Sequence, residues 1–162
     1  MTVARPTLHM IYGKVAAGKS TLASKLAGEG MLIVAQDHWM SRLYKEELAT
    51  VADYLRLIAR LRSAIDPHIV ELLRAGLSIV MDWPANTVAS RAWMKEMAER
   101  GGADIRLHWL DVPDDVCLAR LDARNRSGLH EYVTTPDQYA ELSSYCEPPT
   151  EAEGILTVRM TA

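Results

Sequence analysis

The stretch GKVAAGKS, at residues 13–20, decides the fold of this chain. It fits the pattern G-x-x-x-x-G-K-[ST], which is typical of a loop that binds phosphates (the P-loop). A polyphosphate needs several inward-pointing N–H donors and no crowding side chains, and a loop of glycines and alanines meets both needs. We therefore expect a nucleotide to contact Gly13, Ala16, Ala17, Gly18, Lys19, Ser20 and Thr21.

Each polar side chain of the loop has an expected role. Lys19 can bridge the β- and γ-phosphates, Ser20 can ligate Mg²⁺, and Thr21 is placed to touch the α-phosphate. The alternative is a glycine-rich turn with no ligand, but it leaves Lys19 without a function at a helix start, where a cation opposes the helix dipole. We expect Lys14 to face solvent.

The residues around the loop predict strands that alternate with helices. An apolar run at 8–12 precedes the loop, and further strands are expected at 31–35, 78–81, 105–110 and 155–158. Helices are expected at 19–29, 53–62, 66–76 (capped by Asp66), 87–100, 111–125 and 137–145, with a non-helical connection at 36–41 and a loop at 127–136. This alternation predicts an α/β fold with a parallel sheet.

Size and composition limit the class of protein. The 162 residues, with a formal net charge of −3, favour one domain over 1–162 and argue against nucleic acid as a partner. The two cysteines have no CxxC spacing, the N-terminus lacks a long apolar segment, and no apolar run could cross a membrane. We expect a cytoplasmic protein without a disulfide framework or a signal peptide. The sequence indicates no oligomeric state.

Two aspartates follow predicted strands and should share the edge of the sheet where ligands bind. Asp37 could orient an acceptor hydroxyl and take its proton, or it could merely cap a turn. Asp82 ends the apolar run SIVMD and could hold Mg²⁺ beside Ser20, or it could cap a helix or bind the acceptor. Which of the two is the general base stays open.

Other residues on the same loops are candidates for an acceptor pocket. His38 and Trp39 could line it, or they could be partly buried against the following helix. Trp83 and Asn86 follow Asp82 and could contact the acceptor. Arg91 could reach a phosphate or the acceptor, or lie on a solvated face.

An arginine cluster lies in RLDARNR, at residues 120–126. Arg120 and Arg124 are helical neighbours on one face, and Arg126 ends the helix. Guanidinium groups over a transferring phosphoryl would stabilise its charge, so we expect a lid at about residues 120–137. The alternative is a solvated helix face. His130 is expected to be solvated or packed, and no metal is expected beyond Mg²⁺.

Together these segments resemble the small P-loop kinases of the zeta-toxin, chloramphenicol phosphotransferase, gluconate kinase and polynucleotide kinase group. The resemblance implies a three-layer fold with a five-stranded parallel sheet in the order 2-3-1-4-5. It implies ATP and Mg²⁺ as donor, with Lys19 and Ser20 at the phosphates, Asp37 as base and lid arginines from Arg120 onward.

The sequence therefore predicts an ATP-dependent kinase that phosphorylates a hydroxyl of a small molecule, such as a sugar, a nucleoside or an antibiotic-like compound. One alternative is a regulatory nucleotide-binding module with incidental hydrolysis. Another is a polynucleotide 5′-hydroxyl kinase, kept open by the basic cluster around Arg124. A GTPase is disfavoured because the chain has no N/T-K-x-D segment.

Overall fold

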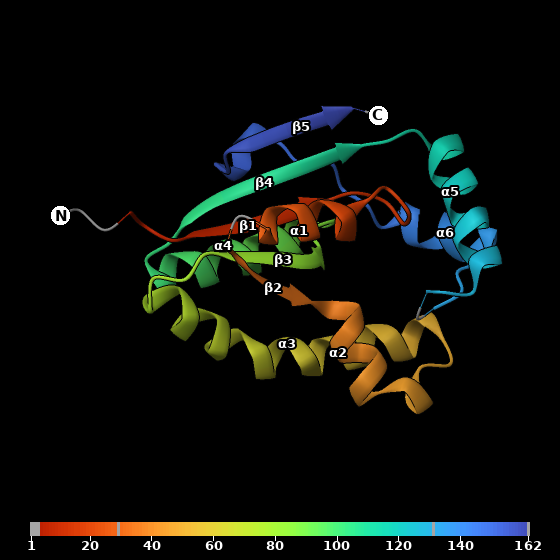
Figure 1. Cartoon of the computed structure of the whole chain (residues 1–162), viewed down its shortest axis with the longest axis horizontal. Coiled ribbons are helices and arrows are strands. Elements are labelled where there is room, and N and C mark those ends of the chain that lie inside the picture. Colours follow the sequence, from red (N-terminus) through yellow and green to blue (C-terminus); the bar gives the residue numbers. More distant parts are fainter. Residues whose placement is uncertain (1–3, 29, 131, 162) are drawn as a thin grey trace.

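The computed structural model describes residues 4–28, 30–130 and 132–161. Five parallel strands form one sheet in the order β2-β3-β1-β4-β5, as the sequence predicted (Figure 1). The strands are β1 (Thr7–Tyr12), β2 (Leu32–Ala35), β3 (Ile79–Pro84), β4 (Asp104–Asp111) and β5 (Thr157–Thr161).

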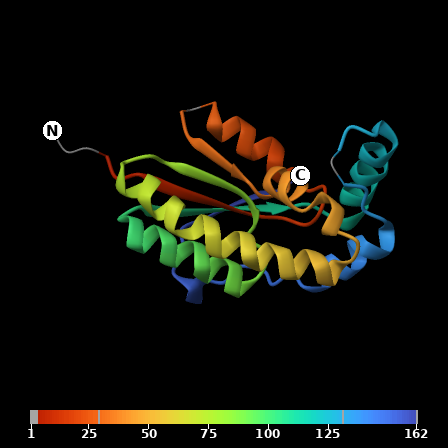
Figure 2. The same cartoon turned by 90° about the horizontal axis from the view of Figure 1, so that it is seen from below.

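Helices cover both faces of the sheet. One face carries α1 (Lys19–Ala27), and the other carries α3 (Val51–Arg74) and α4 (Val88–Gly101) (Figure 2). Three helices lie toward the ends of the strands: α2 (Gln36–Leu43), α5 (Asp114–Ser127) and α6 (Pro136–Ser144). Two short 3₁₀ helices, η1 (Lys45–Glu47) and η2 (Glu151–Glu153), complete the chain. Within the described residues, no helix is both long and apolar enough to cross a membrane.

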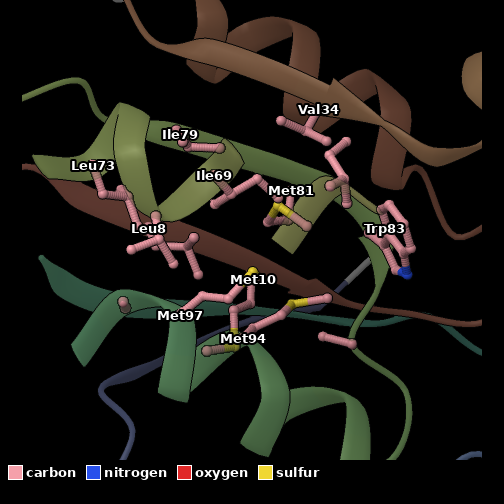
Figure 3. Packing of buried hydrophobic residues seen from close by; sticks show 14 of the residues in the cluster. Leu8, Met10, Val34, Ile69, Leu73, Ile79, Met81, Trp83, Met94 and Met97 are labelled. Carbon is pink, nitrogen blue, oxygen red and sulfur yellow. The ribbon is translucent and has the colours of Figure 1, made fainter. Parts of the chain in front are cut away.

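The main core lies between the sheet and the pair α3 and α4. Figure 3 shows Met10 of β1 beside Met94 and Met97 of α4. The sequence contains no phenylalanine, so methionines and leucines fill the space that aromatic rings often occupy. The two helices approach closely because Gly101 has no side chain; a Cβ there would lie 2.6 Å from Cβ of Leu73.

The structure corrects the prediction of two helices at 53–62 and 66–76. They form the single helix α3, which begins with a capping box between Thr50 and Asp53 and has Pro67 inside it. Asp66 does not cap a helix; its carboxylate accepts hydrogen bonds from Trp93 and Arg100 instead. A proline inside a helix removes one main-chain hydrogen bond, but the side chains that α3 buries on the sheet offset that loss.

Four other elements also differ from the prediction. The segment 36–41 is helical and belongs to α2. Asp111 ends β4 rather than starting α5, and β5 begins at Thr157. Strand β3 continues to Pro84 with a register shift against β1: His9 pairs with Val80, but Ile11 pairs with Pro84. Two extra residues of β3 therefore bulge out beside Asp82, and such bulges re-aim side chains next to functional sites.

Candidate active site

The P-loop joins β1 to α1 and forms an open backbone cradle. Ala16 and Gly18 have positive φ angles of 61° and 103°, and a Cβ placed on Gly18 would meet no atom within 4 Å. No side chain caps the N-terminus of α1. The first N–H groups of α1 are therefore available to an anion, which also gains from the helix dipole.

The ammonium of Lys19 lies inside this cradle. Its Nζ donates hydrogen bonds to the carbonyl oxygens of Gly13, at 2.7 Å, and of Lys14, at 2.8 Å. Burial lowers the pKa of Lys19, while the nearby carboxylates of Asp37 and Asp82 raise it. A cation desolvated beside the loop backbone is suited to bind phosphate oxygens.

Asp82 and Ser20 meet at the end of β3. Burial raises the pKa of Asp82, and a hydrogen bond from the Ser20 hydroxyl lowers it. A hydroxyl and a carboxylate are the hard oxygen ligands that Mg²⁺ prefers, with phosphates and water completing its shell. Among the described residues, no three His, Cys, Asp or Glu side chains lie together as a metal site.

Asp37 lies in the first turn of α2, where its side chain is exposed. Its charge raises the pKa of Lys19, Asp82, Tyr54 and Arg124, so one carboxylate interacts with residues of four other elements. His38 and Trp39 follow it on α2 with exposed side chains. Both were predicted for the acceptor pocket and remain candidates.

Gln36 was not singled out from the sequence. It is buried at the start of α2, and its amide donates hydrogen bonds to the Tyr54 hydroxyl and, at 3.5 Å, to Asp37. These bonds link α2, which carries Asp37, to α3. A glutamine directly after an apolar strand could have indicated such a role.

Of the three arginines predicted for a lid, Arg120 contacts the P-loop and Arg124 is partly buried. Arg120 Nη1 donates to the carbonyl oxygen of Ala17 at 3.3 Å. Arg124 Nε is buried and has no hydrogen-bond partner among the described residues, while its Nη1 lies 3.5 Å from Nε2 of His130. Burial lowers the pKa of Arg124, and the charge of Asp37 raises it.

Arg126 does not join the other two. Its side chain is 77% exposed and forms an ion pair with Asp122 on the outer face of α5. The prediction that Arg126 contacts the nucleotide is therefore corrected, because the helical rotation from Arg124 to Arg126 turns the side chain away.

Three residues predicted for the acceptor pocket lie elsewhere. Trp83 is 3% exposed and packs against Trp93 in the core, with ring centroids 5.3 Å apart. Arg91 is fully buried in an ion pair with Glu153, so neither a phosphate contact nor a solvated face describes it. Asn86 is hydrogen-bonded to the main chain of Gly13.

Lys14 also differs from its prediction. Its Nζ lies 2.6 Å from a carboxylate oxygen of Asp114, which also accepts a hydrogen bond from the Tyr139 hydroxyl at 2.7 Å. The hydrogen bond from Lys14 lowers the pKa of Asp114. The P-loop is thereby connected to the start of α5 and to α6.

A groove that the sequence did not reveal lies at the C-terminal end of α2. It has a volume of about 840 Å³ and is lined by residues 41–47 and Tyr132. Ser41 lies one turn after Asp37 on the same helix face. Pockets for small molecules have volumes of roughly 300–1,000 Å³, so this groove could accept one.

Solved structures with this fold include several kinases. A presumed kinase from Chloroflexus aurantiacus is similar with a TM-score of 0.76 and 18% identity, covering 97% of this chain and 85% of that one. The APS kinase of Mycobacterium tuberculosis, in complex with AMPPNP and APS, has a TM-score of 0.61 and 20% identity, covering 97% and 88%. A chain of the Pnkp1/Rnl/Hen1 RNA repair complex has a TM-score of 0.68 and 18% identity, covering 89% and 45%.

No curated protein matches this chain. A family model does match, and it spans residues 8–149, from β1 through the P-loop and the lid to the segment after α6. The match covers most of the chain and includes the P-loop, Asp37, Asp82, Arg120 and Arg124. The chain therefore belongs to the AAA domain family, and its fold is that of the P-loop kinases.

Proposed function

We propose that this protein is an ATP-dependent kinase that transfers the γ-phosphoryl group to a hydroxyl of a small molecule. One observation carries the proposal: Ala35 at the end of β2 pairs with Asp82, so Asp37, in the first turn of α2, lies at the same sheet edge as Asp82. The charge of Asp37 raises the pKa of Lys19 and Asp82, in keeping with this placement. A nucleotide-binding loop alone would need only Lys19 and Ser20. A carboxylate at the same sheet edge that is not used to order the loop backbone is what an acceptor hydroxyl requires.

Within this proposal each residue has one task. Lys19 and the N-terminus of α1 bind the phosphate oxygens, and Ser20 and Asp82 would hold the Mg²⁺. Asp37 orients the acceptor hydroxyl and takes its proton. Arg120 and Arg124 stabilise negative charge on the transferring group, and the lid excludes water, which would otherwise compete as acceptor. ATP with Mg²⁺ supplies the transferable phosphoryl group.

The groove at residues 41–47 supports a small acceptor. It begins one turn from Asp37, and Tyr132 of the lid lines its other side. An acceptor in this groove would contact both α2 and the lid. The APS kinase of similar fold is a precedent for a small acceptor, and we extend it here to a hydroxylated compound of comparable size. The finer resemblance to the zeta-toxin and gluconate kinase group fits the same proposal.

Calorimetry with Mg²⁺ and AMPPNP tests the nucleotide site first. We expect binding that depends on Mg²⁺. A thermal-shift screen of sugars, nucleosides and antibiotics, with and without AMPPNP, then seeks the acceptor. Compounds that stabilise the protein only together with the nucleotide are expected. A folded protein that binds no nucleoside triphosphate would contradict the proposal.

Asp37→Asn separates transfer from binding. The variant should bind Mg²⁺–AMPPNP within about threefold of the wild type, because Asp37 lies on α2 and accepts its hydrogen bond from Gln36 rather than from the loop. Transfer to the acceptor found in the screen should fall by about a hundredfold, since a general base contributes roughly that factor. Asp53→Asn is the control, because Asp53 caps α3 at the surface. An unchanged transfer rate in Asp37→Asn would remove Asp37 from the base role.

The likeness to the RNA repair chain keeps a second candidate, a polynucleotide 5′-hydroxyl kinase. Arg42 and Lys45 lie at the groove and could contact a phosphate backbone. Binding of an oligonucleotide that weakens steeply with salt, together with 5′-phosphorylation, would favour this candidate. The small-molecule proposal predicts no such binding.

A further inference from the structure

Asn86 makes two hydrogen bonds to Gly13, the first residue of the P-loop. Its Oδ1 accepts from Gly13 N at 3.0 Å, and its Nδ2 donates to the Gly13 carbonyl oxygen at 2.9 Å. The same carbonyl oxygen accepts from Lys19 Nζ at 2.7 Å. Asn86 therefore fixes the position of an atom that binds the ammonium of the loop.

The turn that carries Asn86 is itself held by residues 147–153, which we call the brace. Glu147 N donates to the carbonyl oxygen of Asn86 at 2.7 Å. The carboxylate of Glu147 accepts a hydrogen bond from Val88 N at 2.8 Å, at the start of α4. The main chain on the C-terminal side of Asn86 is thus attached to the brace at two points.

Arg91 attaches the other side of the turn. Its Nη1 donates to the carbonyl oxygens of Ala85 and Glu147, both at 2.9 Å. Its Nε and Nη2 form a two-point ion pair with Glu153 at 2.6 and 2.9 Å. A fully buried guanidinium is costly unless its donors are satisfied, and here four contacts satisfy them. Arg91 therefore joins the residue before Asn86 to both ends of the brace.

We propose that Asn86 is a positioning residue for triphosphate binding, and that Arg91 and the brace hold Asn86 against Gly13. The inference rests on the proposed function, because it assumes that the P-loop binds a triphosphate. Without the Asn86 amide, Gly13 N has no side-chain partner and the Gly13 carbonyl oxygen keeps only Lys19 Nζ, so more of the loop must be ordered by the ligand itself. Ordering a loop on binding weakens affinity.

Calorimetry with Mg²⁺ and two probes, AMPPNP and inorganic tripolyphosphate, tests the first part. Asn86→Ala should weaken both probes by about tenfold, the size of one or two lost positioning bonds. Ser90→Ala is the matched control, because Ser90 lies in the first turn of α4 and its hydroxyl bonds Thr87 rather than the P-loop. It should leave both affinities within about twofold.

Asn86→Asp is the second variant, in case Asn86→Ala does not fold. It keeps the shape and the acceptor for Gly13 N but loses the donor to the Gly13 carbonyl, and it should weaken both probes at least as much. Equal affinities in a folded Asn86 variant and the wild type would overturn the inference. A wild type that binds neither probe would instead overturn the proposed function.

A double-mutant comparison tests the link through Arg91. Glu153→Gln keeps the shape of the brace but removes the charge that Arg91 faces. We expect it to weaken AMPPNP by about threefold in the wild type and not at all in Asn86→Ala, because the effect passes through Asn86. If the losses of affinity caused by Glu153→Gln and Asn86→Ala are additive, the brace does not act on the P-loop through Asn86.

Discussion

The ammonium of Lys19 lies 2.7 Å from the carbonyl oxygen of Gly13, so the loop backbone holds the cation before any phosphate arrives. Lys19→Met should therefore weaken Mg²⁺–AMPPNP by about a hundredfold, the upper range for losing a charged hydrogen-bond donor. Calorimetry measures this loss. Lys14→Met is the matched control, because Lys14 pairs with Asp114; its affinity should stay within about threefold. Equal losses in both variants would contradict the assignment of Lys19.

Arg124 and Arg126 lie two residues apart on α5 but in different surroundings. Arg124 Nε is buried without a partner among the described residues, whereas Arg126 forms an exposed ion pair with Asp122. Arg124→Met should reduce phosphoryl transfer, to an acceptor or to water, by about a hundredfold. Arg126→Met should leave the rate within about twofold. Steady-state kinetics at saturating ATP compare the two, and similar losses would show that the lid acts through overall charge.

His9 of β1 and His108 of β4 form a buried pair, with Nδ1 and Nε2 2.9 Å apart and the rings stacked. Burial, together with the charges of His108 and Arg106, lowers the pKa of His9 to about 4. Burial and the charge of Arg106 also lower the pKa of His108. Between pH 6.5 and about 4 the unfolded chain therefore binds protons that the folded protein does not.

The free energy of unfolding should consequently fall as the pH drops through that window, by roughly 2 kcal/mol. Urea titrations at pH 7.5, 5.5 and 4.5 measure the slope. His9→Leu should flatten it, and His68→Leu, on the exposed face of α3, should not. A slope that is the same in the wild type and His9→Leu would remove the pair as its cause.

Gly101 allows α3 and α4 to pack closely. A Cβ at this position would lie 2.6 Å from Cβ of Leu73, and neither atom is at the flexible end of a side chain. Gly101→Ala should lower the free energy of unfolding by about 2 kcal/mol, a typical cost of overpacking. In a Leu73→Gly background the same substitution should cost little, because no Cβ then remains at position 73. Additive losses in urea titrations would mean that the contact is not the cause.

The parallel sheet and the loop were predictable because their signals are local, whereas the strand order followed from the resemblance to small P-loop kinases. The P-loop pattern with a strand before it and a helix after it determines where β1 ends and α1 begins, and the alternation of elements predicts the parallel sheet. The helix α3 was harder. Pro67 reads as a helix start in the sequence, and only packing along the whole sheet shows that the helix passes through it.

The partners of the site residues were less predictable than their positions. Asp37, Ser20 and Asp82 lie on the same edge because parallel strands end there. Asn86 and Arg91 were placed near that edge but given the wrong neighbours, since their partners Gly13 and Glu153 are 73 and 62 residues away in the chain. Long-range pairing of this kind leaves no periodic pattern in a single sequence.

The two additional residues of β3 between Val80 and Pro84 limit how this protein can be redesigned. A chimera with a different acceptor loop, joined by counting residues from the start of β3, would displace both the Asp82 carboxylate and the Asn86 amide that binds Gly13. The junction of such a chimera should therefore fall after Asn86, so that the bulged end of β3 and Asn86 stay together.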